Sequence, residues 1–118
     1  MYVQNFKDII AWQKSHKLTL VVYELTAKFP KHELFGLVSQ MRRCSVSVPS
    51  NIAEGYKRKS KNDSIHFYVI AESSLEELRY QLFLSRDLKY ITEKEYKQAE
   101  ILAEEVAKLL YAWKINQK

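Results

Sequence analysis

The hydrophobic pattern is most informative in residues 33–58, where positions three and four apart recur as on one helix. Such residues are neighbours because each helical residue turns the chain by about 100°. One stripe is wholly apolar and fits a face packed against a core: Leu34, Leu37, Met41, Cys44, Val48 and Ile52. The adjacent stripe is mixed, with apolar ends: Phe35, Ser39, Arg42, Val46, Pro49, Ala53 and Tyr56. This second face predicts a helix that packs inward and also contacts something outside its own chain.

Three other segments have helical periodicity, and we predict helices over about residues 7–28, 63–88 and 93–115. Thr92 and Glu95 form a capping box at the start of the last one. The last segment also carries the clearest apolar stripe: Tyr96, Ala99, Leu102, Val106, Leu109 and Trp113. Four helices with short connections predict an all-α, up-down-up-down four-helix bundle, formed by residues 1–118 as a single domain.

Pro49 lies in the middle of the second predicted helix. A proline there removes the hydrogen bond to the carbonyl of Ser45 and clashes with it, which costs about 3 kcal/mol. The apolar positions keep their phase from Met41 through Val48 to Ile52. We therefore predict a kinked but continuous helix. The alternative is a break, with Pro49 opening a new helix.

Composition limits the class of protein. Hydrophobic residues make up 47% and charged residues 28%, with only two Gly and two Pro, which is typical of a globular helical chain. The sequence contains no run of 18 apolar residues, and its first ten residues lack the pattern of a signal peptide. We expect a cytoplasmic protein with no membrane partner.

Residues with catalytic or metal-binding potential are scattered. The three histidines do not form a zinc pattern, and Asp63-x-x-His66 is a single, imperfect match to a di-iron motif. Cys44 lies on the core stripe, where an inert thiol is expected. The serines near Pro49 have no histidine in the same helix to act as a base. We predict no enzyme activity, no catalytic residues, no metal site and no cofactor.

Charge is distributed unevenly along a chain whose formal net charge is +5. Residues 1–61 carry 11 Lys+Arg against 4 Asp+Glu, whereas residues 62–118 carry 8 against 10. A basic patch suits nucleic acid or another polyanion, although a solvated helix end is the simpler explanation. The candidate nucleic-acid-binding residues are Arg42, Arg43, Lys57, Arg58, Lys59 and Lys61.

A homo-oligomer is the other expected assembly. A ring needs two different patches on each subunit, because its contacts are head-to-tail. The mixed stripe provides one patch, and aromatic residues off the main stripe of the first helix could belong to the second. The candidate interface residues are Trp12, Tyr23, Phe35, Val46, Pro49, Ala53 and Tyr56.

From about Phe6 to Leu110, the chain resembles the 23S rRNA intervening-sequence proteins. The main signature is Glu33, Phe35-Gly36-Leu37, Gln40, Arg42-Arg43, Val48-Pro49-Ser50-Asn51-Ile52-Ala53-Glu54-Gly55 and Arg58. Other matches precede and follow it: Trp12-Gln13, Leu18, Tyr23, Leu25-Thr26, Phe29-Pro30, Phe67, Ala71, Ser74, Glu77-Leu78 and Gln81. Two small residues depart from the pattern, Cys44 in place of a common alanine and Ser73 in place of a common glycine.

The resemblance implies a left-handed four-helix bundle that assembles into a cyclic homopentamer. It also implies a bacterial gene, found inside rRNA intervening sequences or standing alone. Members of the family resemble non-enzymes of poorly defined role, and gene context suggests RNA association. The leading hypothesis is a non-catalytic oligomeric protein that binds RNA or another nucleic acid. The alternative is a structural or protein-interaction scaffold with no nucleic-acid ligand.

Overall fold

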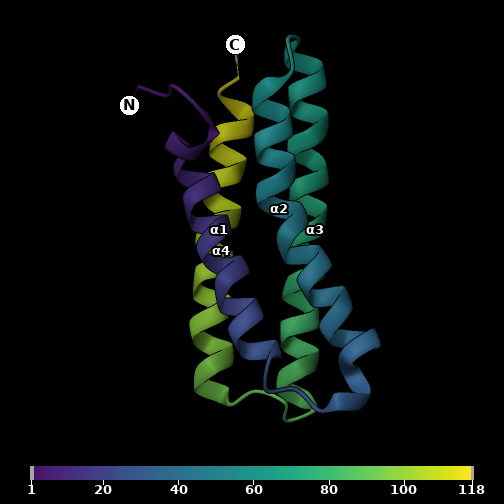
Figure 1. The fold of residues 1–118 in the computed structure, drawn as a ribbon. Helices are drawn as coiled ribbons and strands as arrows, with labels where there is room; N and C mark the ends of the chain where they lie inside the picture. Colours follow the sequence, from purple (N-terminus) through teal and green to yellow (C-terminus); the bar gives the residue numbers. More distant parts are fainter. Residues whose placement is uncertain (1, 118) are drawn as a thin grey trace.

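The computed structural model describes residues 2–117, which form four long helices and no strand. The helices are α1 (Ile10–Thr26), α2 (Ser39–Lys57), α3 (Lys61–Asp87) and α4 (Glu93–Ile115). In Figure 1 the α1–α2 and α3–α4 connections lie at one end, while the α2–α3 connection and both termini lie at the other. Within residues 2–117, none of the helices combines the length and the apolar character needed to span a bilayer. The predicted capping box is confirmed, because Thr92 and Glu95 exchange hydrogen bonds at the start of α4.

All four helices contribute fully buried side chains to one core, including Leu18, Val22, Met41, Ile52, Leu78, Leu82, Val106 and Leu110. The buried line of α4 differs from the predicted stripe by one position, since Ala103 and Leu110 are buried whereas Leu102 and Leu109 are only partly buried. The inner face of α4 places small alanines against the neighbouring helices, and its larger residues flank them. An apolar face wider than about 100° does not by itself show which of its residues lie at the centre.

The second helix begins later than predicted, and Leu34 lies outside the core. A 3-10 turn (η2, Lys31–Glu33) and a π-helical turn (η3, Leu34–Val38) precede α2. Gly36 has non-helical dihedral angles, φ −112° and ψ −109°, so the helical phase does not continue back through it. Leu34 is therefore 50% exposed, although Met41, Cys44, Val48 and Ile52 are buried as predicted. The assignment of Leu34 to the core stripe was wrong.

Glu33 holds this irregular turn in place. Its Oε1 accepts a hydrogen bond from the backbone N–H of Leu37 at 3.1 Å, and its Oε2 accepts one from the hydroxyl of Tyr90 at 2.9 Å. The Leu37 N–H, followed by the Tyr90 hydroxyl, lowers the pKa of the Glu33 carboxyl below its usual value. Because Tyr90 lies in the α3–α4 connection, these bonds join the two loops at this end of the bundle.

Helix α2 continues through Pro49, as predicted, and Ile52 remains fully buried. The ribbon of α2 bends near its middle in Figure 1. Proline has no N–H to donate to the carbonyl of Ser45. In the structure the hydroxyl of Thr19 donates to that carbonyl at 2.9 Å, from the neighbouring helix α1. The hydrogen bond that Pro49 removes within α2 is thus replaced by one between helices.

Helices α2 and α3 meet along a seam of small and polar residues, which we call the α2–α3 seam: Ser47, Asn51, Gly55 and Ser74. The hydroxyls of Ser47 and Ser74 are 2.8 Å apart, and the amide of Asn51 donates to the Ser47 carbonyl at 2.8 Å. Gly55 is so close to α3 that a Cβ atom there would lie 2.5 Å from Cε1 of Tyr68. The seam therefore requires small side chains on α2.

Candidate functional site

The side chains with catalytic potential do not converge. Within residues 2–117 there is no group of three or more His, Cys, Asp or Glu arranged to hold a metal ion. His16 stacks on Trp12, with ring centroids 5.2 Å apart, while His66 lies next to Phe67 at 5.7 Å. Burial, followed by a hydrogen bond to Glu77, raises the pKa of the Cys44 thiol. A raised pKa disfavours the thiolate that nucleophilic chemistry would need.

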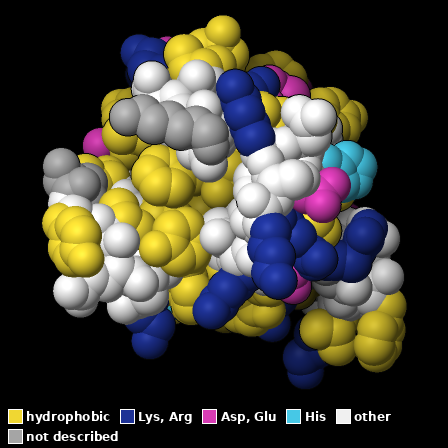
Figure 2. Space-filling model, turned by 90° about the horizontal axis from the view of Figure 1, so that it is seen from above, with side chains coloured by type: hydrophobic (Ala, Val, Ile, Leu, Met, Phe, Trp, Pro, Cys, Tyr) yellow, Lys and Arg dark blue, Asp and Glu magenta, His cyan; other side chains and the backbone are white. Residues whose placement is uncertain are grey.

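Basic residues gather at the α2–α3 connection, and we call Lys57, Arg58, Lys59 and Lys61 the basic end. Lys57 ends α2, Lys61 begins α3, and all four side chains are exposed. The N–H of Arg58 bonds to the Gly55 carbonyl, and the Ser60 hydroxyl caps α3 by accepting from the N–H of Asp63. These two caps make the turn tight, so the four cations stay close together. Figure 2 looks onto this end of the molecule and shows Lys and Arg side chains gathered on one side, beside an apolar area.

The lysines of the basic end are not neutralised by neighbouring carboxylates. Among the described residues, no Asp or Glu forms an ion pair with Lys57, Lys59 or Lys61. Arg58 does have partners: its Nη2 lies 3.0 Å from Oε2 of Glu54, and its Cζ lies 4.5 Å from the centroid of the Phe67 ring. The site therefore offers three unpaired cations around one oriented guanidinium.

Arg42 and Arg43 are not part of the basic end. They precede Arg58 by about 15 residues on α2, which corresponds to about 22 Å at 1.5 Å per residue. Arg42 binds helix α1: its Nε donates to the hydroxyl of Thr26 at 2.9 Å, and its Cζ lies 4.5 Å from the ring centroid of Tyr23. Arg43 forms a hydrogen bond with Gln40. The structure thus brings together four of the six basic residues singled out from the sequence.

Four of the seven candidate interface residues line one groove between α1 and α2, which we call the α1–α2 groove. Its volume is about 350 Å³, and its lining is mainly apolar: Phe6, Trp12, His16, Thr19, Val46, Pro49, Ser50 and Ala53. Pro49 is itself buried, so it forms the floor of the groove more than its rim. Tyr23 and Leu20 are exposed farther along α1. Leu20 was missed, although its spacing from His16 and Tyr23 follows the helical repeat.

Tyr56 and Phe35 lie in different surroundings. Tyr56 is half-buried and packs against the core, and its hydroxyl donates to the carbonyl of Val3 at 3.4 Å. Phe35 is 92% exposed on the irregular turn before α2. Helix α2 runs from that turn toward the basic end, and its groove residues, Val46 to Ala53, lie more than two helical turns after Phe35 in the chain. A contact that used both Phe35 and the groove would cover much of the length of α2.

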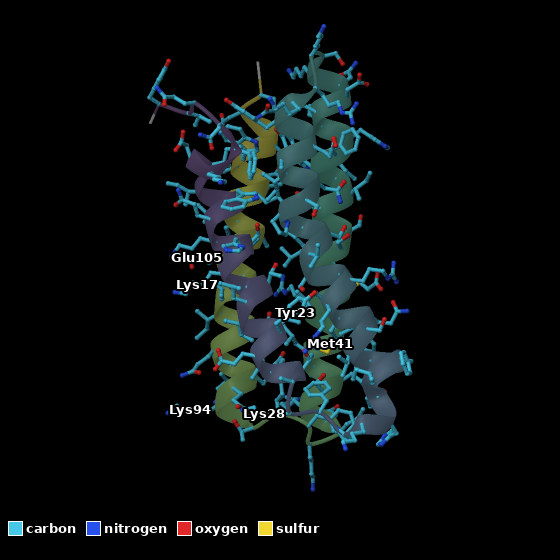
Figure 3. The ribbon with its side chains drawn as sticks, in the orientation of Figure 1. Lys17, Tyr23, Lys28, Met41, Lys94 and Glu105 are labelled. Carbon is cyan, nitrogen blue, oxygen red and sulfur yellow. The ribbon has the colours of Figure 1, made fainter. Side chains whose placement is uncertain are left out.

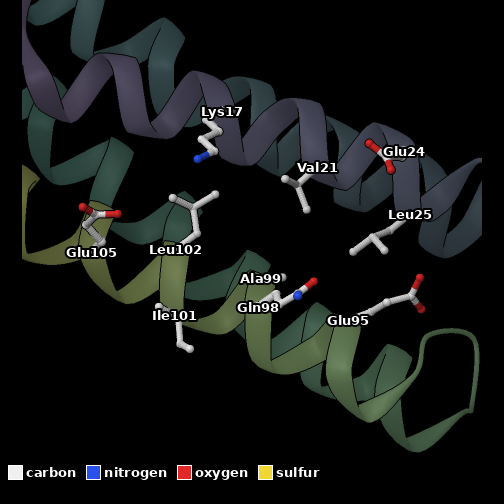
Figure 4. A pocket seen from close by; sticks show the side chains of 10 residues that line it. All are labelled: Lys17, Val21, Glu24, Leu25, Glu95, Gln98, Ala99, Ile101, Leu102 and Glu105. Carbon is white, nitrogen blue, oxygen red and sulfur yellow. The ribbon is translucent and has the colours of Figure 1, made fainter.

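A second groove, between α1 and α4, was not predicted from the sequence. Its volume is about 480 Å³, with an apolar floor that includes Val21, Leu25 and Leu102. Figure 4 shows Lys17, Glu24 and Glu105 on its rim. Nearby ion pairs connect the two helices, Lys14 with Glu105 at 3.5 Å and Lys28 with Glu95 at 3.1 Å. Figure 3 places Lys17 and Glu105 midway along the bundle and Lys28 near the end opposite the basic end.

Over residues 2–117, these features define an all-helical protein with four long helices, a basic end and surface grooves beside α1. The chain belongs to the 23S rRNA-intervening sequence protein family, because the sequence profile of that family matches residues 7–112. The resemblance seen in the sequence is thereby confirmed.

A solved structure has a similar fold. It is described as a protein with unknown function from the S23 ribosomal protein family, from Bacteroides thetaiotaomicron VPI-5482. The two chains are 26% identical, the TM-score is 0.84, and the match covers 93% of this chain and 99% of the other. A comparison with curated proteins finds no match.

Proposed function

We propose that this protein is a non-catalytic RNA-binding protein whose basic end contacts the phosphates of a single strand. The observation that carries the proposal is the set of three exposed lysines, Lys57, Lys59 and Lys61, that no carboxylate of the described chain neutralises. Cations held close together repel one another, and a polyanion relieves this repulsion while releasing its own counterions. Arg58 adds a fourth charge in the same turn.

We predict that the affinity for single-stranded RNA depends on these lysines. If the three lysines of the basic end contact phosphates, the log–log slope of affinity against salt should be about −2.1. The variant Lys57→Ala/Lys59→Ala/Lys61→Ala should bind about a hundredfold more weakly at about 0.1 M salt, with almost no dependence on salt. The measurement is fluorescence anisotropy of a labelled oligouridylate of about 12 nucleotides over a salt series.

A matched variant controls for net charge. Lys31→Ala/Lys94→Ala/Lys97→Ala removes the same number of lysines, and none of these three forms an ion pair among the described residues. Lys94 lies at the opposite end of the bundle in Figure 3. This control should retain the affinity and slope of the wild type. The absence of binding at low salt, or an equal loss in both variants, would favour the scaffold hypothesis instead.

We also propose self-association through the α1–α2 groove, with the left-handed up-down-up-down bundle as the repeating unit of a cyclic homo-oligomer. The supporting observation is the largely apolar lining of the groove, together with the exposed Leu20 and Tyr23 beside it. Phe35, 92% exposed, supplies a different apolar patch, as a head-to-tail contact requires. A homo-oligomer of this kind is compatible with RNA binding and would repeat the basic end around an axis.

Light scattering after size exclusion tests this contact. The wild type should have the mass of an oligomer, a whole-number multiple of the 14.0 kDa of one chain and larger than it. Val46→Glu should shift the mass toward the monomer, because an unpaired carboxylate in a desolvated contact is unfavourable. Ile101→Glu is the control, since Ile101 is also exposed but lies on α4. A wild-type mass of 14.0 kDa at micromolar concentration would rule the assembly out.

A further inference from the structure

We infer that the Arg58–Phe67 stack binds an unpaired base, so that the basic end recognises a single strand through a base as well as through phosphates. The inference rests on the proposed RNA binding and gives this surface a specific ligand chemistry, an unstacked nucleobase with flanking phosphates. Bases of single strands stack on aromatic rings and on guanidinium planes, whereas the paired bases of a duplex are not open to such contacts.

The guanidinium of Arg58 is already oriented in the free protein. Its Cζ lies over the ring of Phe67, 4.5 Å from the ring centroid. Its Nη2 is hydrogen-bonded to Glu54 Oε2 at 3.0 Å, which limits rotation of the plane. The Arg58 side chain nevertheless remains 43% exposed. A planar group fixed in advance loses less conformational entropy when a ligand stacks on it.

Two other arginines stack on aromatic rings, and neither offers a comparable surface. Arg86 is engaged by two rings, with its Cζ 4.4 Å from the centroid of Phe83 and 4.9 Å from that of Tyr96. It also pairs with Asp87 at 3.1 Å and with Glu93 at 3.7 Å. Arg42, described above, is hydrogen-bonded to helix α1. Arg58 is the one of the three that combines an aromatic support with exposed, unpaired lysines beside it.

The surroundings of the stack suit a nucleotide strand. Lys57, Lys59 and Lys61 lie on both sides of Arg58 in the chain and can meet the phosphates before and after the stacked base. His66 is exposed, and its ring lies 5.7 Å from that of Phe67 in an edge-to-face arrangement. The geometry therefore separates the tasks of the site, with stacking on the arginine and charge neutralisation on the lysines.

Two substitutions separate stacking from charge. Phe67→Leu removes the ring that supports the guanidinium and leaves every charge in place. Arg58→Lys keeps the charge but has no planar face to stack on. Each variant should bind the labelled oligouridylate about tenfold more weakly than the wild type, because the stacking of one base is lost. The salt slope should be unchanged, because every phosphate contact is retained. Thermal unfolding followed by circular dichroism checks that both variants remain folded.

Phe83→Leu is the matched control, because Phe83 also lies beneath an arginine on α3 but is near the opposite end of that helix. It should bind like the wild type. The affinity of the wild type for an abasic oligomer of equal length should be no higher than the affinity of Phe67→Leu for the oligouridylate. Equal binding of the two oligomers, or full affinity in Phe67→Leu, would overturn base stacking. RNA binding would then depend on the lysines and not on base stacking. A wild type that binds neither oligomer would refute RNA binding itself.

Discussion

Replacing Gly55 by alanine should lower the free energy of unfolding by about 2 kcal/mol. A Cβ atom at this position would lie 2.5 Å from Cε1 and 2.9 Å from Cδ1 of Tyr68, and 3.0 Å from the backbone carbonyl oxygen of Ser64. The Tyr68 ring is fully buried, so neither it nor the backbone of α3 can move away cheaply. In a helix without such contacts, Gly→Ala would stabilise by about 1 kcal/mol. Here the overpacking against Tyr68 outweighs this gain, so the substitution destabilises the protein.

Chemical denaturation of Gly55→Ala against the wild type measures the effect. Gly36→Ala is a useful comparison, because the nearest atom to a Cβ atom there is Oε1 of Glu33 at 2.9 Å, the end of a flexible side chain. That substitution should be less destabilising than Gly55→Ala. A Gly55→Ala protein as stable as the wild type would show that α2 and α3 are not held as closely as the structure indicates.

Thr19→Val should also destabilise the protein by about 2 kcal/mol, since it leaves a buried carbonyl without a donor. The two side chains have nearly the same shape, so the main loss is the donation from the Thr19 hydroxyl, which the Ser45 carbonyl at 2.9 Å shares with the Ser15 carbonyl of α1 at 3.0 Å. Both residues are buried, and water cannot readily replace the hydroxyl. Pro49 cannot supply the missing N–H from within α2.

A double-mutant cycle tests this explanation directly. In Pro49→Ala the new backbone N–H can donate to the Ser45 carbonyl, so Thr19→Val should then cost at most about 1 kcal/mol. The two substitutions should therefore couple by about 1 kcal/mol or more. An identical effect of Thr19→Val in both backgrounds would show that the hydroxyl does not compensate for Pro49.

The regular part of the fold was predictable because local signals agreed with one another. Helix α4 runs from Glu93 to Ile115, as predicted, since its capping box marks the start and its apolar spacing indicates the buried side to within one position. The turn before α2 was not predictable, because its form depends on the bond between Glu33 and Tyr90, which are far apart in the sequence. Leu34 is exposed because this turn interrupts the helical phase at Gly36.

In the candidate sites, too, features within one segment were predictable, whereas features that depend on packing between segments were not. The cations of residues 57–61 are neighbours in the sequence, so their proximity in space follows from a short turn. The binding of Arg42 to Thr26 and Tyr23 depends on how α1 packs on α2, and helical periodicity contains no such information. For the same reason the groove between α1 and α4 could not be predicted, since its two walls come from opposite ends of the chain.

The α2–α3 seam also has a consequence for the motions of the bundle. The hydrogen bond between the hydroxyls of Ser47 and Ser74 and the contact at Gly55 join α2 and α3 into one closely packed pair. Helix α1 is instead flanked by surface grooves on both its α2 and its α4 sides. Regions with fewer buried contacts open at lower free energy. We therefore expect α1 and α4 to open locally while α2 and α3 stay paired, so that the basic end at their connection keeps its shape during such fluctuations.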